Sequence, residues 1–103
     1  MMVRYPIMVL AACLALGLAG SANAAGDPEA GKTKAAKCGS CHGKNGEGKK
    51  KNPPIAGMAE AEHVKALQDY QSGVREHKAM QRSVKKLTDQ DFADIAAYYA
   101  SLK

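Results

Sequence analysis

The clearest pattern of apolar positions lies near the C-terminus. Apolar side chains recur there every three or four residues, at Phe92, Ile95, Tyr98 or Tyr99, and Leu102. Residues at this spacing share one face of an α-helix, so the pattern predicts an amphipathic helix with one buried face. Thr88 is a suitable N-cap, and Asp91 three residues later can complete a capping box. The sequence therefore predicts a helix that begins just after Thr88.

A second helix is predicted at the start of the polar part of the chain. Asp27 can cap it, and Pro28 suits the first helical position, where its missing N–H is not needed. We expect this helix to run to about Lys37 and to lead directly to Cys38. Gly31 lies in its interior, where glycine costs about 1 kcal/mol relative to alanine. A close packing contact at Gly31 is therefore expected.

Two more helices are predicted between these. A periodic segment runs from about Ala59 to Ser72, and Gly73 is a natural stop after it. A short helix is expected from about Gln81 to Lys86. No alternating run of apolar and polar residues reaches five, so the sequence favours an all-α fold.

The N-terminal segment has the pattern of a secretory signal peptide. Arg4 precedes an apolar run over residues 7–20, and Ala22-Asn23-Ala24 fits a small-residue cleavage site. The run is too short to span a bilayer comfortably, because about 20 apolar residues are needed. We therefore expect residues 1–24 to be removed, leaving one domain at 25–103, without a transmembrane segment, in the periplasm.

Cys13 allows a different interpretation of this segment. Leu10-Ala11-Ala12-Cys13 resembles the lipobox of bacterial lipoproteins, in which the cysteine carries a lipid anchor. However, the apolar run continues past Cys13, and the cleavage pattern lies downstream of it. We favour Cys13 as an apolar residue of the leader, with lipid anchoring as the alternative.

Size and charge limit the possible classes of function. The whole chain has 103 residues and a net charge of +5, and the expected mature domain loses only Arg4 among its charged residues. This density of basic residues is below that of a nucleic-acid-binding domain, though it could favour an acidic protein partner. A domain of this size also has too small a core to be very stable without a covalent or cofactor-based support.

The stretch Cys38-Gly39-Ser40-Cys41-His42 carries the most specific chemistry. It reads C-x-x-C-H, the attachment signature of a c-type haem, in which two thiols bond the haem and the histidine binds the iron. A zinc ribbon would need a second ligand pair, and a thioredoxin-like redox pair would need a βαβ context. A disulfide between Cys38 and Cys41 would close too small a loop to add much stability. The cofactor interpretation is therefore favoured.

Haem iron accepts two axial ligands, and His42 would supply the first. Its Nδ1–H then needs an acceptor, for which the Pro53-Pro54 loop is the candidate. The candidates for the second ligand are Met58, His63, His77 and Met80. We expect His63, inside a regular helix, to be a surface or partly buried histidine. His77 and Met80 lie in an irregular segment that could present a ligand to the iron, and the spacing alone does not choose between them.

An ordered set of motifs resembles the class I cytochromes c over essentially all of residues 25–103. The set comprises Gly31, Cys38–Gly43, Pro53–Gly57, Leu67–Gly73 with Arg75, Met80, Leu87–Asp91 and Ile95–Tyr99. Within that family the chain is similar to the small single-haem periplasmic members and to one half of the bacterial dihaem cytochromes.

The resemblance implies a cytochrome c fold of three main helices and a short one around one covalent haem c. It further implies that Met80 is the distal ligand, that the Pro53 carbonyl accepts a hydrogen bond from His42, and that Gly31 packs against Tyr98. Met58 departs from the family pattern, since many relatives carry a polar residue there; we expect it to fill space near the haem.

Histidine and methionine ligation would leave no open position on the iron, which suits electron transfer rather than catalysis. We therefore expect a non-enzymatic, monomeric electron carrier that exchanges electrons with redox-partner proteins. Three alternatives remain: a haem subunit docked in a larger dehydrogenase or sulfur-oxidising complex, a ligand-sensing haem protein with Met80 displaced, and a thiol–disulfide oxidoreductase. The basic run Lys49–Lys51 is either a docking rim or, as we favour, a solvated loop.

Overall fold

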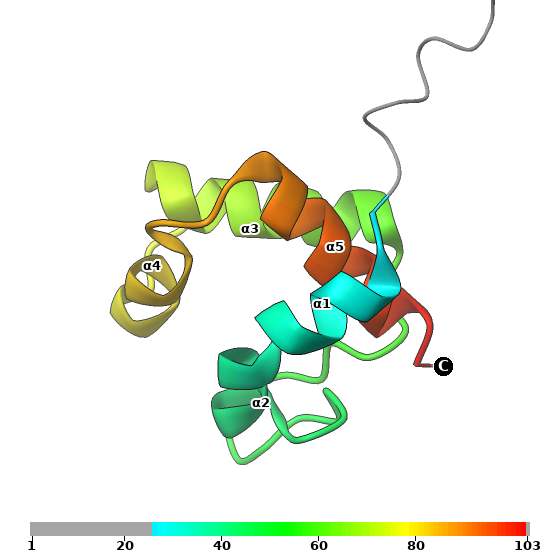
Figure 1. The fold of residues 1–103 in the computed structure, drawn as a ribbon. Coiled ribbons are helices and arrows are strands. Elements are labelled where there is room, and N and C mark those ends of the chain that lie inside the picture. The colour runs from blue at the N-terminus through cyan, green and yellow to red at the C-terminus, as the bar shows by residue number, and fades with distance from the viewer. Residues whose placement is uncertain (1–25, 103) are drawn as a thin grey trace, which may run out of the picture.

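The computed structural model describes residues 26–102, and within them the chain forms five helices and no strand (Figure 1). The helices are α1 (Pro28–Lys34), α2 (Ala36–His42), α3 (Glu60–Ser72), α4 (Lys78–Val84) and α5 (Asp89–Ala100). The all-α prediction is thus confirmed. The expected signal peptide at 1–24 and Cys13 lie outside the described residues.

The crossing of α1 and α5 brings the two ends of the domain together (Figure 1). Gly31 lies at the point of contact, where a Cβ atom would overlap the backbone carbonyl of Asp94 and lie 2.9 Å from Cβ of Tyr98. Only glycine allows two helix backbones to approach this closely. The expected packing of Gly31 against Tyr98 is confirmed, and it explains an otherwise unfavourable residue inside a helix.

An ion-pair network stabilises the same crossing of α1 and α5. The Lys34 ammonium lies 2.8 Å from Asp91 and 2.6 Å from Asp94, whose side chain also accepts hydrogen bonds from the Asp27 backbone N–H and the Gln90 amide. Asp94 is buried, so its charge needs these partners. The Lys34 contact, followed by the Asp27 hydrogen bond, lowers the pKa of Asp94 to about 2.

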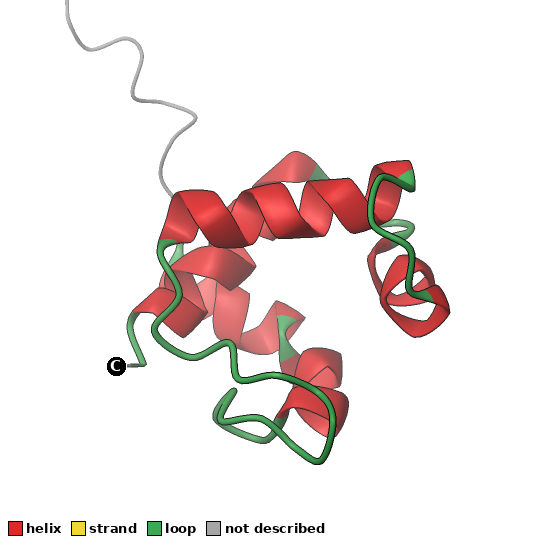
Figure 2. Ribbon diagram, turned by 180° about the vertical axis from the view of Figure 1, so that it is seen from behind, coloured by secondary structure: helices red, strands yellow, loops and turns green. Residues whose placement is uncertain are grey.

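The hydrophobic core lies where α3 packs on α5. Phe92, Ile95 and Tyr99 of α5 are almost completely buried and pack with Leu67 of α3 and with Ala35, which lies between α1 and α2. In Figure 2, α3 runs along the top, α4 lies at its C-terminal end, and the long loop that joins α2 to α3 lies below. In this arrangement α2, α3 and α4 all contribute residues to the lining of one cavity.

The Gln71 side chain ties α3 to the turn between α4 and α5. Its amide donates to the carbonyl oxygens of Val84 and Leu87, both at 2.8 Å. These contacts fix the position of α4, which has few contacts with the rest of the core. None of the helices within residues 26–102 is long and apolar enough to cross a membrane.

The prediction for the first helix is wrong at the C-terminal end. It stops at Lys34, Ala35 takes a non-helical conformation, and a separate helix, α2, begins at Ala36. The cause is tertiary, because the residues before the break pack on α5, whereas those after it carry the thiols and His42 in a different direction. The C-x-x-C-H motif therefore lies on a helix of its own.

The other helix predictions differ less from the structure. The α3 helix starts one residue after Ala59 and ends at Ser72, with Gly73 in the left-handed conformation at φ +91°. The predicted capping box between Thr88 and Asp91 is present at the start of α5. The short helix α4 begins and ends earlier than the predicted range of Gln81 to Lys86, because His77 supplies its N-cap.

We expect Gly31→Ala to destabilise the holoprotein by about 1–3 kcal/mol, because neither helix backbone can move aside for the new methyl group. Gly39→Ala in α2 is the matched control. Its Cβ would meet the Cα and the carbonyl oxygen of Lys44 at 3.6 and 3.9 Å, both ordinary contacts, so this variant should be neutral or slightly more stable. Urea unfolding of both variants measures the difference, and equal stabilities would contradict the close-contact explanation.

Asp94 should make the domain sensitive to acid. Its folded pKa of about 2 lies below the ordinary value of 3.8, so the unfolded chain takes up this proton first. Its contribution to stability is present above pH ~4 and is lost as the pH falls towards 2. In Asp94→Asn the free energy of unfolding should be lower at neutral pH and should decline less steeply in acid. Equal acid slopes for the two proteins would contradict this assignment.

Candidate functional site

A cavity of about 360 Å³ opens between α2, the loop after it, α3 and α4. Its volume is within the range typical of cofactor sites. It is lined by both cysteines of the motif, by every candidate axial ligand and by the predicted acceptor: Cys38, Cys41, His42, Pro53, Met58, His63, His77 and Met80. The fold thus brings together residues that are up to 42 positions apart in the sequence.

The two thiols lie on one side of α2, because a spacing of three residues places both near the same helix face. Both are free; Cys38 is half-buried and Cys41 is exposed. Burial raises the pKa of the Cys38 thiol. A catalytic dithiol pair requires the opposite shift, towards a stable thiolate. This environment disfavours the thiol–disulfide oxidoreductase alternative.

His42, the last residue of α2, is held in one orientation. Its Nδ1 lies 2.8 Å from the carbonyl oxygen of Pro53, the same pair of residues that the family resemblance implied. Because a carbonyl only accepts, the proton must lie on Nδ1, and the lone pair on Nε2 remains free for a metal. The ring is thus prepared as a metal ligand before any metal binds.

The loop that carries Pro53 is held against α2 by several hydrogen bonds. The Asn52 side chain donates to the Cys41 carbonyl at 2.9 Å, and the Gly48 N–H donates to the His42 carbonyl at 2.6 Å. Gly46 accepts hydrogen bonds from two backbone N–H groups further along the loop. A side chain at Gly46 would collide with the Tyr99 ring, and its φ is +74°. The loop geometry therefore requires glycine there.

His63 differs from our expectation of a surface or partly buried residue. It is 3% exposed, in the first turns of α3, and its ring lies 5.6 Å from that of Tyr99. The expectation was wrong because α3 turns this face inwards. His63 is four residues before Leu67 and seven before Tyr70, so the spacing of the apolar face could have indicated its burial.

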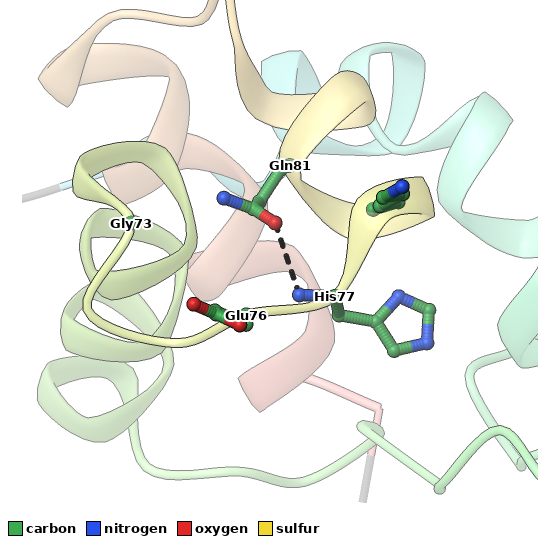
Figure 3. A pocket seen from close by; sticks show the side chains of 5 residues that line it. Gly73, Glu76, His77 and Gln81 are labelled. Atoms are coloured by element: carbon green, nitrogen blue, oxygen red, sulfur yellow. Dashed lines mark hydrogen bonds between the residues drawn. The ribbon is translucent and has the colours of Figure 1, made fainter.

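His77 and Met80 lie together at the start of α4. His77 is the N-cap, and its Nδ1 accepts a hydrogen bond from the Met80 N–H at 3.4 Å. Its own N–H donates to the Gln81 side chain at 3.0 Å, while the imidazole points away from Gln81 (Figure 3). An imidazole that accepts through Nδ1 carries its proton on Nε2 when neutral. His77 is therefore arranged as a helix cap, and Met80 stays half-buried beside the cavity.

Aromatic contacts support this corner of the cavity. The Arg75 guanidinium lies 5.4 Å from the centroid of the Tyr70 ring, and Tyr70 meets His77 edge-on at 6.5 Å. The hollow shown in Figure 3 lies next to them, is open, and has a volume of about 530 Å³. It contains neither thiol nor methionine, so the cavity with the C-x-x-C-H motif remains the candidate site.

The comparisons with known proteins agree with this site. A family model described as cytochrome c matches residues 28–103. The chain belongs to the cytochrome c family. It is 45% identical over 97 residues to cytochrome c4 of Pseudomonas aeruginosa, covering 93% of this chain and 48% of that protein. It is also 37% identical to cytochrome c-553 of Helicobacter pylori, covering 87% of this chain and 95% of that protein.

Solved structures are similar to this cytochrome c fold. The crystal structure of reduced recombinant cytochrome c4 from Pseudomonas stutzeri superposes with a TM-score of 0.72 at 40% identity, covering 77% of this chain and 47% of that one. The chain spans about half the length of the cytochrome c4 relatives that it matches.

Membership of the family implies a covalently attached haem c, and the cavity fits this group. Two free thiols lie on one face of α2, His42 offers a free Nε2, and apolar side chains such as Ile55 and Leu67 complete the lining. In contrast, residues 26–102 contain no group of three or more His, Cys, Asp or Glu side chains that could hold a metal ion. The ligand set therefore suits haem rather than a zinc ribbon.

The N-cap at His77 should control local order around Met80. In His77→Ala the Met80 N–H loses its acceptor, so this amide should exchange with deuterium faster by about fivefold, corresponding to ~1 kcal/mol for a lost cap. His77→Asn is the matched control, because asparagine can accept the same hydrogen bond and should keep exchange slow. Unchanged Met80 exchange in His77→Ala would contradict the capping role.

Proposed function

We propose that this protein is a periplasmic electron carrier and not an enzyme. In this proposal residues 1–24 direct export and are removed, and residues 25–103 carry one covalent haem c. Cys38 and Cys41 hold the haem through thioether bonds, and His42 and Met80 are its axial ligands. When bound, the haem supplies a one-electron iron couple, which is the chemistry of the carrier.

The observation that carries the proposal is that His42 and Met80 reach one cavity from two different elements. His42 comes from α2 and Met80 from α4, two helices that lie apart in Figure 1, and both residues line the cavity. Two residues on separate elements could hold a haem iron between them, whereas two residues on a single helix turn could not.

The hydrogen bonds argue against His63 and His77 as the distal ligand. The Nδ1 of His77 is occupied as a helix cap, and the Nδ1 of His63 lacks the acceptor that a ligand histidine normally has. Met58 also lines the cavity, from the loop between α2 and α3 that carries Pro53. Met80 lines it from α4, an element separate from those that carry His42 and Pro53, and the family resemblance assigns the distal role to Met80.

A thioether as sixth ligand suits electron transfer. It favours ferrous over ferric iron more than a second imidazole does, which raises the reduction potential, and it closes the iron to substrates. The hydrogen bond from His42 to the Pro53 carbonyl holds one proposed ligand in a single orientation, which would limit rearrangement when the oxidation state changes. Pro53, through its carbonyl, has this positioning role for His42.

The partners would be redox proteins that donate and accept single electrons. The exposed Cys41 places one edge of the site near solvent, where a partner could approach. Lys50 and Lys51 are exposed and follow Cys41 closely in the sequence. We retain the interpretation that they form a solvated loop. A haem subunit that stays docked in a larger redox complex would use the same site and the same chemistry.

Substitution of the distal ligand tests the proposal. The chain is expressed with a haem-maturation system, and haem that resists extraction into acidified organic solvent indicates covalent attachment. In Met80→Ala the far-red absorption band of the ferric protein should disappear, and the reduction potential should fall because the thioether is lost. Met58→Leu is the matched control and should keep the band.

Three results would contradict the proposal. Extractable haem would exclude attachment through Cys38 and Cys41. A far-red band that survives Met80→Ala but disappears in Met58→Leu would transfer the ligand role to Met58. Rapid binding of carbon monoxide to the reduced native protein would instead support the ligand-sensing alternative.

A further inference from the structure

His63 has a polar ring that the proposed electron-transfer site does not use. The residue lines the haem cavity, yet only 3% of its surface is exposed. Its Nδ1 is fully enclosed and has no hydrogen-bond partner, the only such buried side-chain nitrogen or oxygen atom found in residues 26–102. A buried polar atom without a partner is unfavourable and rare, so the arrangement calls for a physical reason.

The protonation state of the ring follows from its burial. Desolvation, with a smaller effect of the nearby His42, lowers the pKa of His63 to about 4. At neutral pH the imidazole is therefore uncharged and carries a single N–H. The remaining question is which of the two nitrogens holds that proton.

The surroundings favour Nε2. A proton on Nδ1 would be a buried donor with no acceptor, which the fold could avoid simply by moving the proton to the other nitrogen. Nδ1 is enclosed by protein and His63 lines the cavity, which points to the Nε2 edge of the ring as the part that faces the cavity. His42 is the opposite case, since its Nδ1 has an acceptor and its Nε2 keeps a lone pair.

We propose that His63 donates a hydrogen bond inside the haem cavity: its Nε2–H binds an oxygen acceptor there, either a carboxylate of the bound haem or a water held beside it. This inference rests on the covalent haem of the proposed function, but it does not depend on which residue is the distal ligand. The Tyr99 ring, 5.6 Å away and tilted by 38°, supports the imidazole from behind.

Such a donor would affect the reduction potential. A hydrogen bond to a haem carboxylate offsets part of the negative charge that stabilises ferric iron. Its loss should therefore favour the oxidised protein and lower the potential. A bound water would transmit the same effect more weakly, because the donor then polarises a neutral group.

The experiment compares holoprotein variants at one pH. The His63→Leu variant replaces the imidazole with an apolar side chain of similar bulk. Its ferrous-to-ferric ratio at a fixed potential should fall about threefold to tenfold, where tenfold equals 59 mV for one electron. His63→Gln restores an N–H donor and should recover part of the difference. Tyr99→Phe keeps the ring contact and should leave the potential unchanged.

Nitrogen-15 NMR of the reduced holoprotein tests the tautomer and identifies the acceptor. We expect an Nε2–H resonance of His63 that exchanges slowly with solvent. Magnetisation transfer from this proton to the carboxylate side chains of the haem would identify a haem carboxylate as the acceptor, whereas transfer to a bound water would identify water. Both results support a donor directed into the cavity.

Two results would overturn the inference. One is an Nδ1–H tautomer for His63. The other is a His63→Leu protein with the native potential and higher stability, which would mean that the imidazole is simply an unpaired buried polar group. In either case the haem remains covalent and the Met80-dependent ferric band remains intact, so failure here is distinguishable from failure of the proposed function.

Discussion

The close approach of α1 to α5 at Gly31 is the contact on which the arrangement of the site depends. It joins the two ends of the domain at a distance that no larger residue would allow, and the Lys34 ion pairs with Asp91 and Asp94 close the same crossing. Because α1 is held there, the chain must turn at Ala35 before it continues as α2. That turn sets the direction in which the thiols and His42 enter the cavity.

Three histidines line the same cavity, and the partner of Nδ1 distinguishes their roles. His42 donates through Nδ1 to a carbonyl, which leaves Nε2 ready for a metal. His77 accepts through Nδ1 from a backbone N–H, which makes it a helix cap. His63 has no Nδ1 partner and is enclosed as a neutral ring. The surroundings decide where the proton of each imidazole lies, which suits His42 to its proposed role as a ligand, His77 to a helix cap and His63 to its proposed role as a donor.

Much of the fold was predictable because its determinants are local. The capping box at Thr88, the stop at Gly73 and the proline after Asp27 each act within one helical turn. The haem signature is local as well, since a covalent attachment site needs only the thiols and the adjacent histidine. The break at Ala35 could not be predicted in this way, because alanine favours helix and the cause of the break is packing on α5.

The sequence alone determined the helical class, the candidate residues for haem attachment, the need for a close contact at Gly31 and a short set of possible distal ligands. Only the tertiary structure decided that His63 is buried, that His77 caps α4, and that Met80 borders the same cavity as His42. The physical reason is the range of the interactions. Caps and motifs act over a few residues, whereas burial and the proton position on an imidazole depend on groups that only folding brings together.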